Sequence, residues 1–88
     1  MKSELVGPHW YVYMVRCVDS TIYTGITRDI NARVLQHNAG HGAKYTRSRR
    51  PVVLVYQEGV ADRGAALRRE YEIKCLTAHE KHRLILSS

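Results

Sequence analysis

The sequence predicts a small α/β sandwich of the α+β type, in which a three-stranded sheet is flanked by helices. Two stretches rich in β-branched and aromatic residues, 10–18 (WYVYMVRCV) and 22–27 (IYTGIT), are separated by a short turn. A third apolar run covers residues 51–56 (PVVLVY), and capped helical segments lie between and after these runs. We therefore expect the order β-β-α-β-α-α in one domain, residues 1–88, with a core from about 9 to 86.

The first two strands should form a hairpin with the three-residue loop 19–21, which pairs Cys17 with Tyr23. This register puts Tyr13 and Tyr23 on the same face of the sheet, because side chains alternate along a strand. A two-residue loop would put them on opposite faces. Gly25, inside the second strand, indicates a bulge or a close approach of other atoms to the backbone.

The first helix should begin after Asp29 as its N-cap and end near Gly40. At about 100° per residue, one face of this helix should meet the sheet. That face carries Ile30, Arg33, Val34 and His37.

Two further helices are predicted after the third strand. Asp62 should begin one that runs to about Leu76. Thr77 and Glu80 have the spacing of a capping box, which predicts a last helix to about Leu86.

Two places on these helices, one of them a pair of residues, need a partner of opposite charge. Arg33 and His37, potentially cationic and four residues apart, flank an apolar face, where a bound phosphate would satisfy them. The alternative is an arginine that extends to solvent and a surface histidine. Glu70 shares a stripe with two apolar residues and needs a cation there, either a metal ion or Lys74 at i+4.

The charge balance favours a polyanionic partner. Lys and Arg number 14 against 8 Asp and Glu, a net charge of +6. The loop 40–50 (GHGAKYTRSRR) concentrates this charge and could hold a short helical turn. Such a loop can follow a phosphate backbone, and its tyrosine can stack on an unpaired base, although a solvated charge run is the alternative. The candidate DNA-binding residues are Lys44, Tyr45, Arg47, Arg49 and Arg50.

Several classes of protein are disfavoured. The chain has no G-x-x-x-x-G-K-[ST] pattern, so no nucleotide cofactor is expected. Cys17 and Cys75 form neither a disulfide framework nor a zinc quartet, and free thiols in a reducing cytosol are expected. There is no apolar run of about 18 residues and no apolar N-terminal segment, so we expect a cytoplasmic protein without a membrane partner.

The order of these motifs resembles the GIY-YIG nuclease superfamily over roughly residues 10–84. Val12-Tyr13 stands where the family has Ile-Tyr, and Tyr23-Thr24-Gly25 matches the second signature with Thr for Ile. Arg33 and His37 reproduce its Arg-x-x-x-His, and Glu70 matches its metal-binding glutamate. The stretches IYTGIT and GHGAKYTR are similar to the short, single-domain bacterial branch, that of predicted endonucleases with a URI-type domain. Two features depart from the pattern: Tyr11 replaces a common glycine, and no Asn follows Glu70 late in the domain.

The resemblance implies an antiparallel three-stranded sheet and phosphodiester hydrolysis with one divalent ion, Mg²⁺ or Mn²⁺. The metal ligand would be Glu70. Either Tyr13 or Tyr23 would act as general base or orient the attacking water, and both remain candidates. Arg33 would stabilise charge on phosphoryl oxygens, and His37 would hydrogen-bond a tyrosine or relay a proton. Together these two would supply the cationic field that a tyrosine needs to act at neutral pH.

The expected function is therefore a metal-dependent DNA endonuclease with little sequence specificity, because 88 residues leave no room for a separate groove-reading domain. Single-stranded DNA, or otherwise branched DNA, is the favoured substrate, and repair, recombination or DNA processing would be compatible roles. The alternatives are a non-catalytic nucleic-acid-binding module and a nuclease subunit that needs a specificity-giving partner.

Overall fold

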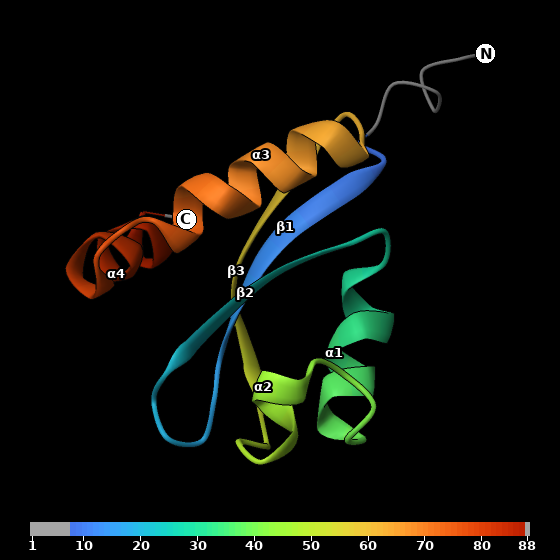
Figure 1. Cartoon of the computed structure of the whole chain (residues 1–88), viewed down its shortest axis with the longest axis vertical. Helices are drawn as coiled ribbons and strands as arrows, with labels where there is room; N and C mark the ends of the chain where they lie inside the picture. The colour runs from blue at the N-terminus through green and yellow to red at the C-terminus, as the bar shows by residue number, and fades with distance from the viewer. Residues whose placement is uncertain (1–7, 88) are drawn as a thin grey trace.

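The computed structural model describes residues 8–87, which form a three-stranded sheet with helices on both faces (Figure 1). The strands are β1 (Trp10–Arg16), β2 (Ile22–Thr27) and β3 (Val53–Val60). Their order in the sheet is β2-β1-β3, and β1 is antiparallel to both neighbours. The predicted antiparallel sheet is confirmed, with the first strand of the chain at its centre.

The helices are α1 (Ile30–Asn38), α2 (Lys44–Arg47), α3 (Arg63–Lys74) and α4 (Ala78–Leu86). In Figure 1, α1 and α2 lie on one side of the sheet and α3 and α4 on the other. The predicted order is confirmed, and α2 occupies the loop that could hold a helical turn. Within residues 8–87, no helix is long and apolar enough to cross a membrane.

Side-chain caps start the long helices where the sequence predicts. Asp29 and Asp62 each accept a hydrogen bond from the backbone N–H three residues on, at 3.1 and 2.8 Å. At the start of α4, the Thr77 hydroxyl accepts from the Glu80 N–H at 3.1 Å and the Glu80 carboxylate accepts from the Thr77 N–H at 2.8 Å. Each cap satisfies backbone N–H groups that have no partner inside the helix.

The predicted hairpin register is wrong by two residues. Val15 pairs with Tyr23, and the loop spans residues 17–21, closed by a bond from Cys17 N–H to Thr21 O at 2.8 Å. The first strand accordingly ends at Arg16 and not at residue 18. Because a shift of two preserves the alternation of faces, the prediction that Tyr13 and Tyr23 share a face is confirmed.

The wider loop has a local cause. The Asp19 carboxylate accepts from both the N–H and the hydroxyl of Thr21, at 3.1 and 2.6 Å. Ser20 adopts a positive φ of 71°. This Asp-centred turn takes the Thr21 N–H out of the strand ladder, so pairing starts only beyond it.

The third strand also differs from its predicted bounds of 51–56. It covers Val53–Val60, and Trp10 pairs with Val60 at its far end. The segment QEGV is not an apolar run, so its composition alone does not predict a strand. Pairing with β1 overrides that composition, since β3 lies at an edge of the sheet, where alternate residues can face solvent.

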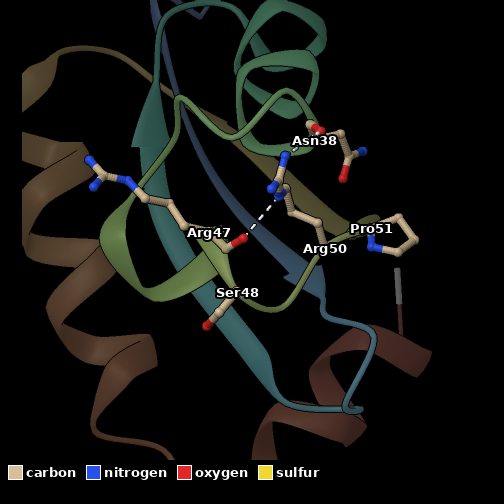
Figure 2. Close-up of a pocket in the computed structure, with 5 residues that line it drawn as sticks. All are labelled: Asn38, Arg47, Ser48, Arg50 and Pro51. Carbon is tan, nitrogen blue, oxygen red and sulfur yellow. Dashed lines mark hydrogen bonds between the residues drawn. The ribbon is translucent and has the colours of Figure 1, made fainter.

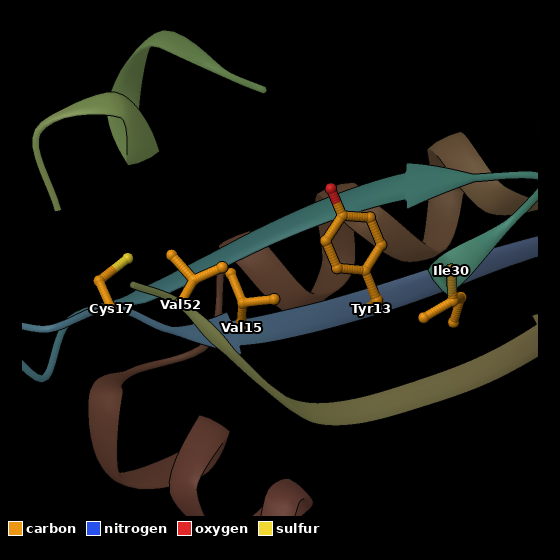
Figure 3. Packing of buried hydrophobic residues seen from close by; sticks show 5 residues of the cluster. All are labelled: Tyr13, Val15, Cys17, Ile30 and Val52. Atoms are coloured by element: carbon orange, nitrogen blue, oxygen red, sulfur yellow. The ribbon is translucent and has the colours of Figure 1, made fainter. Parts of the chain in front are cut away.

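The two faces of β1 carry two separate cores. On the α1 side, Tyr13, Val15 and Cys17 pack with Ile30 and Val52, as Figure 3 shows. The second core lies between the opposite face of β1 and the helices α3 and α4. It contains Val12 and Met14 of β1 and Ala66 and Ile73 of α3. The central strand is therefore buried on both faces, as its apolar sequence predicts.

Candidate active site

A buried tyrosine and a buried histidine meet on the α1 side of the sheet. The hydroxyl of Tyr13 is hydrogen-bonded to Nε2 of His37 at 2.7 Å, and the two residues are 1% and 0% exposed. The Tyr13 ring leans across β2, with its hydroxyl over that strand (Figure 3). A Cβ at Gly25 would lie 2.7 Å from this hydroxyl oxygen. The close approach predicted at Gly25 is confirmed, and it is made by the Tyr13 side chain.

Tyr23, from β2, completes an aromatic cluster beside this pair. Its ring centroid lies 6.4 Å from that of Tyr13 and 5.4 Å, edge-on, from that of His37. Tyr45 of α2 stacks on Tyr23 at 6.0 Å and 24°. Tyr23 is only partly buried, so of the two signature tyrosines it is the one in contact with solvent.

Arg33 adds a cation to the cluster. Its guanidinium donates to Gln36 Oε1 at 2.9 Å, and its charge acts on Tyr13. Burial raises the pKa of Tyr13 to about 12, and this outweighs the lowering by Arg33. Burial, and then the charge of Arg33, hold the pKa of His37 below its ordinary value. The expectation that Arg33 and His37 both carry positive charge is corrected for His37. The lowered pKa of His37 favours the uncharged imidazole at neutral pH, and the raised pKa of Tyr13 favours the protonated phenol.

The second nitrogen of His37 is held by residues that the sequence reasoning missed. His37 Nδ1 is hydrogen-bonded to Thr46 Oγ1 at 2.7 Å, and this hydroxyl donates to the Ala43 carbonyl at 2.9 Å. Thr46 is fully buried. Gly42 is buried against the imidazole, and a Cβ there would lie 2.8 Å from the His37 Cα. No periodicity marks these positions, because they lie in a loop and a single helical turn.

Glu70 lies on α3 and is mostly buried, with 18% of its side chain exposed. Its carboxylate pairs with Lys74 Nζ at 3.1 Å, so one of the two expected cations is present. On the other flank of α3, Arg69 donates to Glu58 of β3 at 3.0 Å. Glu70 shares a face of α3 with Ala66 and Ile73, which are buried against the sheet.

The charge of Glu70 reaches the tyrosine cluster, where it contributes to raising the pKa of Tyr13. Among residues 8–87, no group of three or more His, Cys, Asp or Glu side chains could hold a metal ion. A single carboxylate fits a Mg²⁺-like ion, which keeps most of its waters and also takes phosphate oxygens. Glu70 is therefore the residue that would hold such an ion.

The basic loop divides into free and engaged side chains. Arg49 donates to Asp19 and to the Tyr45 carbonyl, at 3.1 and 2.8 Å, and its guanidinium carbon lies 3.9 Å from the Tyr45 ring centroid. Tyr45 thus contacts both Arg49 and Tyr23, and it remains 38% exposed. The side chains of Lys44 and Arg47 have no acidic partner within the described part of the chain.

Arg50 lines a pocket of about 480 Å³ beside this loop. It donates to the carbonyls of Arg47 and Asn38, at 2.9 and 3.4 Å. Figure 2 shows the Arg50 side chain turned toward the Arg47 carbonyl, whereas the Arg47 side chain extends away from Arg50. Two residues that line this pocket, Asn38 and Arg47, follow His37 and Thr46 in the sequence. No member of the tyrosine cluster lines it.

Residues 9–83 match the GIY-YIG catalytic domain. The chain belongs to the GIY-YIG family. A UPF0213 protein of Staphylococcus haemolyticus is 55% identical over 75 residues, which cover 85% of this chain and 92% of that protein. A UPF0213 protein of Staphylococcus aureus is 57% identical with the same coverage.

Solved structures agree with this GIY-YIG assignment. The solution NMR structure of a UPF0213 protein from Bacillus halodurans has 40% sequence identity and a TM-score of 0.59, covering 90% of this chain and 84% of that one. A solution NMR structure of a protein from E. faecalis has 35% identity and a TM-score of 0.60, with coverages of 92% and 84%. A GIY-YIG catalytic domain implies nuclease activity on nucleic acid, and GIY-YIG nucleases generally use divalent metal ions.

Proposed function

We propose that this GIY-YIG protein is a metal-dependent endonuclease that hydrolyses DNA phosphodiester bonds with little sequence preference. The observation that carries the proposal is the gathering of Tyr13, Tyr23 and His37 into one cluster from β1, β2 and α1. Arg33 and Glu70 act electrostatically on the same cluster from α1 and α3. These interactions support the proposal that the five candidate catalytic residues form one site.

We assign the water-facing role to Tyr23. Tyr13 is 1% exposed and its hydroxyl is bonded to His37, whereas Tyr23 is partly exposed. The Tyr23 oxygen accepts a hydrogen bond from the attacking water and aligns it with phosphorus. As the new O–P bond forms and the bond from phosphorus to the leaving oxygen breaks, the water gives its proton to the Tyr23 oxygen. The phenol's own proton passes to solvent, and solvent protonates the leaving oxygen.

Arg33 stabilises the negative charge that builds on the phosphoryl oxygens, because a partly exposed guanidinium presents several donors to a phosphate. Tyr13, bonded to His37, positions Arg33, whose charge acts on it. A divalent ion bound at Glu70 would neutralise charge on the phosphate and on the leaving oxygen. The 3.1 Å pair with Lys74 supports this role, since it shows that the Glu70 carboxylate is reached by a cation.

Lys44 and Arg47 are the side chains that we propose to contact the DNA backbone, since neither is used in an internal ion pair of the described residues. For unpaired bases, Tyr71 is a second candidate ring beside the predicted Tyr45, which contacts Arg49 and Tyr23 and is 38% exposed. Tyr71 follows Glu70 directly on α3 and is 71% exposed. An exposed ring next to Glu70 in the sequence supports single-stranded DNA as the substrate.

The proposal is tested by incubating the full chain with end-labelled single-stranded, duplex and branched DNA, each with Mg²⁺, Mn²⁺ or EDTA. We expect internal cuts that require the divalent ion and are fastest on single strands. Binding to the same DNAs is measured in parallel by fluorescence anisotropy. Binding without cutting would contradict the nuclease and favour a binding module or a partner-dependent subunit.

A further inference from the structure

Four groups from three segments form an unbroken chain of hydrogen bonds. The Tyr13 hydroxyl bonds His37 Nε2 at 2.7 Å, and His37 Nδ1 bonds Thr46 Oγ1 at 2.7 Å. The Thr46 hydroxyl then donates to the Ala43 carbonyl at 2.9 Å. Tyr13, His37 and Thr46 are each no more than 1% exposed, so water does not supply alternative partners in the middle of the chain.

The Ala43 carbonyl at one end of this chain determines the direction of every bond in it, because a carbonyl oxygen only accepts. Each hydroxyl has one proton, and a neutral imidazole has one N–H and one bare nitrogen. With Thr46 donating to Ala43, its oxygen must accept from His37 Nδ1–H. The bare Nε2 then accepts the proton of the Tyr13 hydroxyl, whose oxygen remains open to Arg33.

The reverse direction fails at Tyr13. If Thr46 donated to Nδ1, the proton of His37 would lie on Nε2 and point at the Tyr13 oxygen. The Tyr13 proton would then have no acceptor among the hydrogen bonds of the described residues. An unsatisfied donor at a site 1% exposed is unfavourable.

We infer that Thr46, held by the Ala43 carbonyl, is a positioning residue that fixes His37 as the neutral tautomer protonated on Nδ1. This inference concerns the arrangement of protons, and its catalytic consequence rests on the proposed nuclease function. The fixed tautomer turns the Tyr13 proton inward, so the outer lone pair of Tyr13 holds Arg33 toward the phosphate. Thr46 therefore acts on the reaction through His37, Tyr13 and Arg33 without touching the substrate.

The test compares Thr46→Val, which keeps the shape of the side chain but removes the hydroxyl, with Thr46→Ser, which restores the hydroxyl. Thr24→Val is the matched control, because Thr24 is also buried (3% exposed) but its hydroxyl has no hydrogen-bond partner among the described residues. The first readout is the two-bond ¹H–¹⁵N spectrum of the His37 ring, which distinguishes the two neutral tautomers. The second is the separation of kcat from KM for DNA cleavage.

We expect the Nδ1–H tautomer in the wild-type chain, in Thr46→Ser and in Thr24→Val, and its loss or mixing with the other tautomer in Thr46→Val. By analogy with the outer partners of metal-bound histidines, kcat should fall roughly ten- to a hundredfold in Thr46→Val, with KM little changed. Thr46→Ser should recover most of that loss.

A wild-type spectrum of the Nε2–H tautomer would overturn the inference, as would an unchanged tautomer and kcat in Thr46→Val. If Thr46→Val does not fold, the wild-type and Thr46→Ser spectra still decide the tautomer. If the wild-type chain cleaves no DNA, the proposed function fails, but the spectrum tests the direction of the chain independently.

Discussion

Single residues create the space in which the cluster forms. Gly25 leaves room for the Tyr13 hydroxyl over β2, and Gly42 leaves room for the His37 ring beside the loop. The sequence marks Gly25 because a glycine interrupts a strand of β-formers, and the close approach there could be predicted. Gly42 lies in a loop where glycines are common, so its contact with His37 could not.

Adding one methyl group at Gly25 should therefore damage the site. In Gly25→Ala the new Cβ would lie 2.7 Å from the Tyr13 hydroxyl, so the ring must move and its bond to His37 must break. We expect a destabilisation of about 1–3 kcal/mol and a large loss of cleavage, measured by urea unfolding and by the DNA assay. Gly64→Ala is the control, since its nearest contacts would be 3.4 and 3.5 Å. Equal stability of Gly25→Ala and wild type would contradict this packing.

His37 should make stability depend on pH. Its pKa is lowered by burial and by Arg33, so the unfolded chain takes up a proton at this residue more readily than the folded chain. The unfolding free energy should be at its full value above about pH 6.5 and should decrease as the pH falls below it. We expect the drop in Tm between about pH 7.5 and pH 5.5 to be smaller in His37→Gln than in wild type. An equal drop would show that His37 is not protected from protonation.

At the scale of elements, both central residues of α2 contact the site. Thr46 is hydrogen-bonded to His37, and the adjacent Tyr45 stacks on Tyr23. Arg49 then ties this segment to the β1–β2 loop through Asp19. The sequence predicts a basic, DNA-facing loop here, and could not predict its structural role, because the contacts are with residues far away in the sequence.

This division of the basic loop predicts different effects for its arginines. Arg47→Ala should weaken DNA binding and lower the slope of log K against log salt by about one unit, while the folded state is unaffected. Arg49→Ala should lower Tm, because it removes the pair with Asp19 and the contact with Tyr45, and should change the salt slope less. Salt titrations by anisotropy and thermal melts measure both. A reversal of the two phenotypes would show that Arg49 is the phosphate ligand.

The long elements follow from local signals much better than the site does. N-caps at Asp29, Asp62 and Thr77 predict where three helices start, and all three are confirmed. The hairpin register is wrong because the Asp19 turn replaces ladder pairing with side-chain bonds. Local sequence specifies caps and faces, whereas register and loop contacts depend on which distant groups meet.

At the scale of the whole molecule, the proposed site draws residues from both sides of the sheet. The α1 and α2 side holds the tyrosines and histidine in place, and Glu70 belongs to α3 on the other side. Recognition of the family motif in the sequence predicts these four residues together with Arg33. Their polar support by α2, and the burial that keeps His37 neutral, depend on packing that the motif does not describe.

The exposed face of α3 should influence the choice of substrate. Tyr71→Ala removes a ring that is 71% exposed next to Glu70, so the affinity for single-stranded DNA should decrease by about five- to a hundredfold. Tyr71→Phe should retain it, since stacking needs the ring and not the hydroxyl. Affinity for duplex DNA should change little. A similar loss for both forms of DNA would contradict a base-stacking role.

The central claim, that Glu70 holds the metal of a nuclease, is tested most directly by measuring Mg²⁺-dependent cleavage in Glu70→Gln beside Glu72→Gln. Both variants remove one carboxylate from α3, but Glu72 is 63% exposed and pairs with Arg69 on the opposite flank. We predict that Glu70→Gln abolishes cutting while DNA binding and Tm persist, and that Glu72→Gln cuts like wild type. Full activity in Glu70→Gln would contradict the proposed metal site.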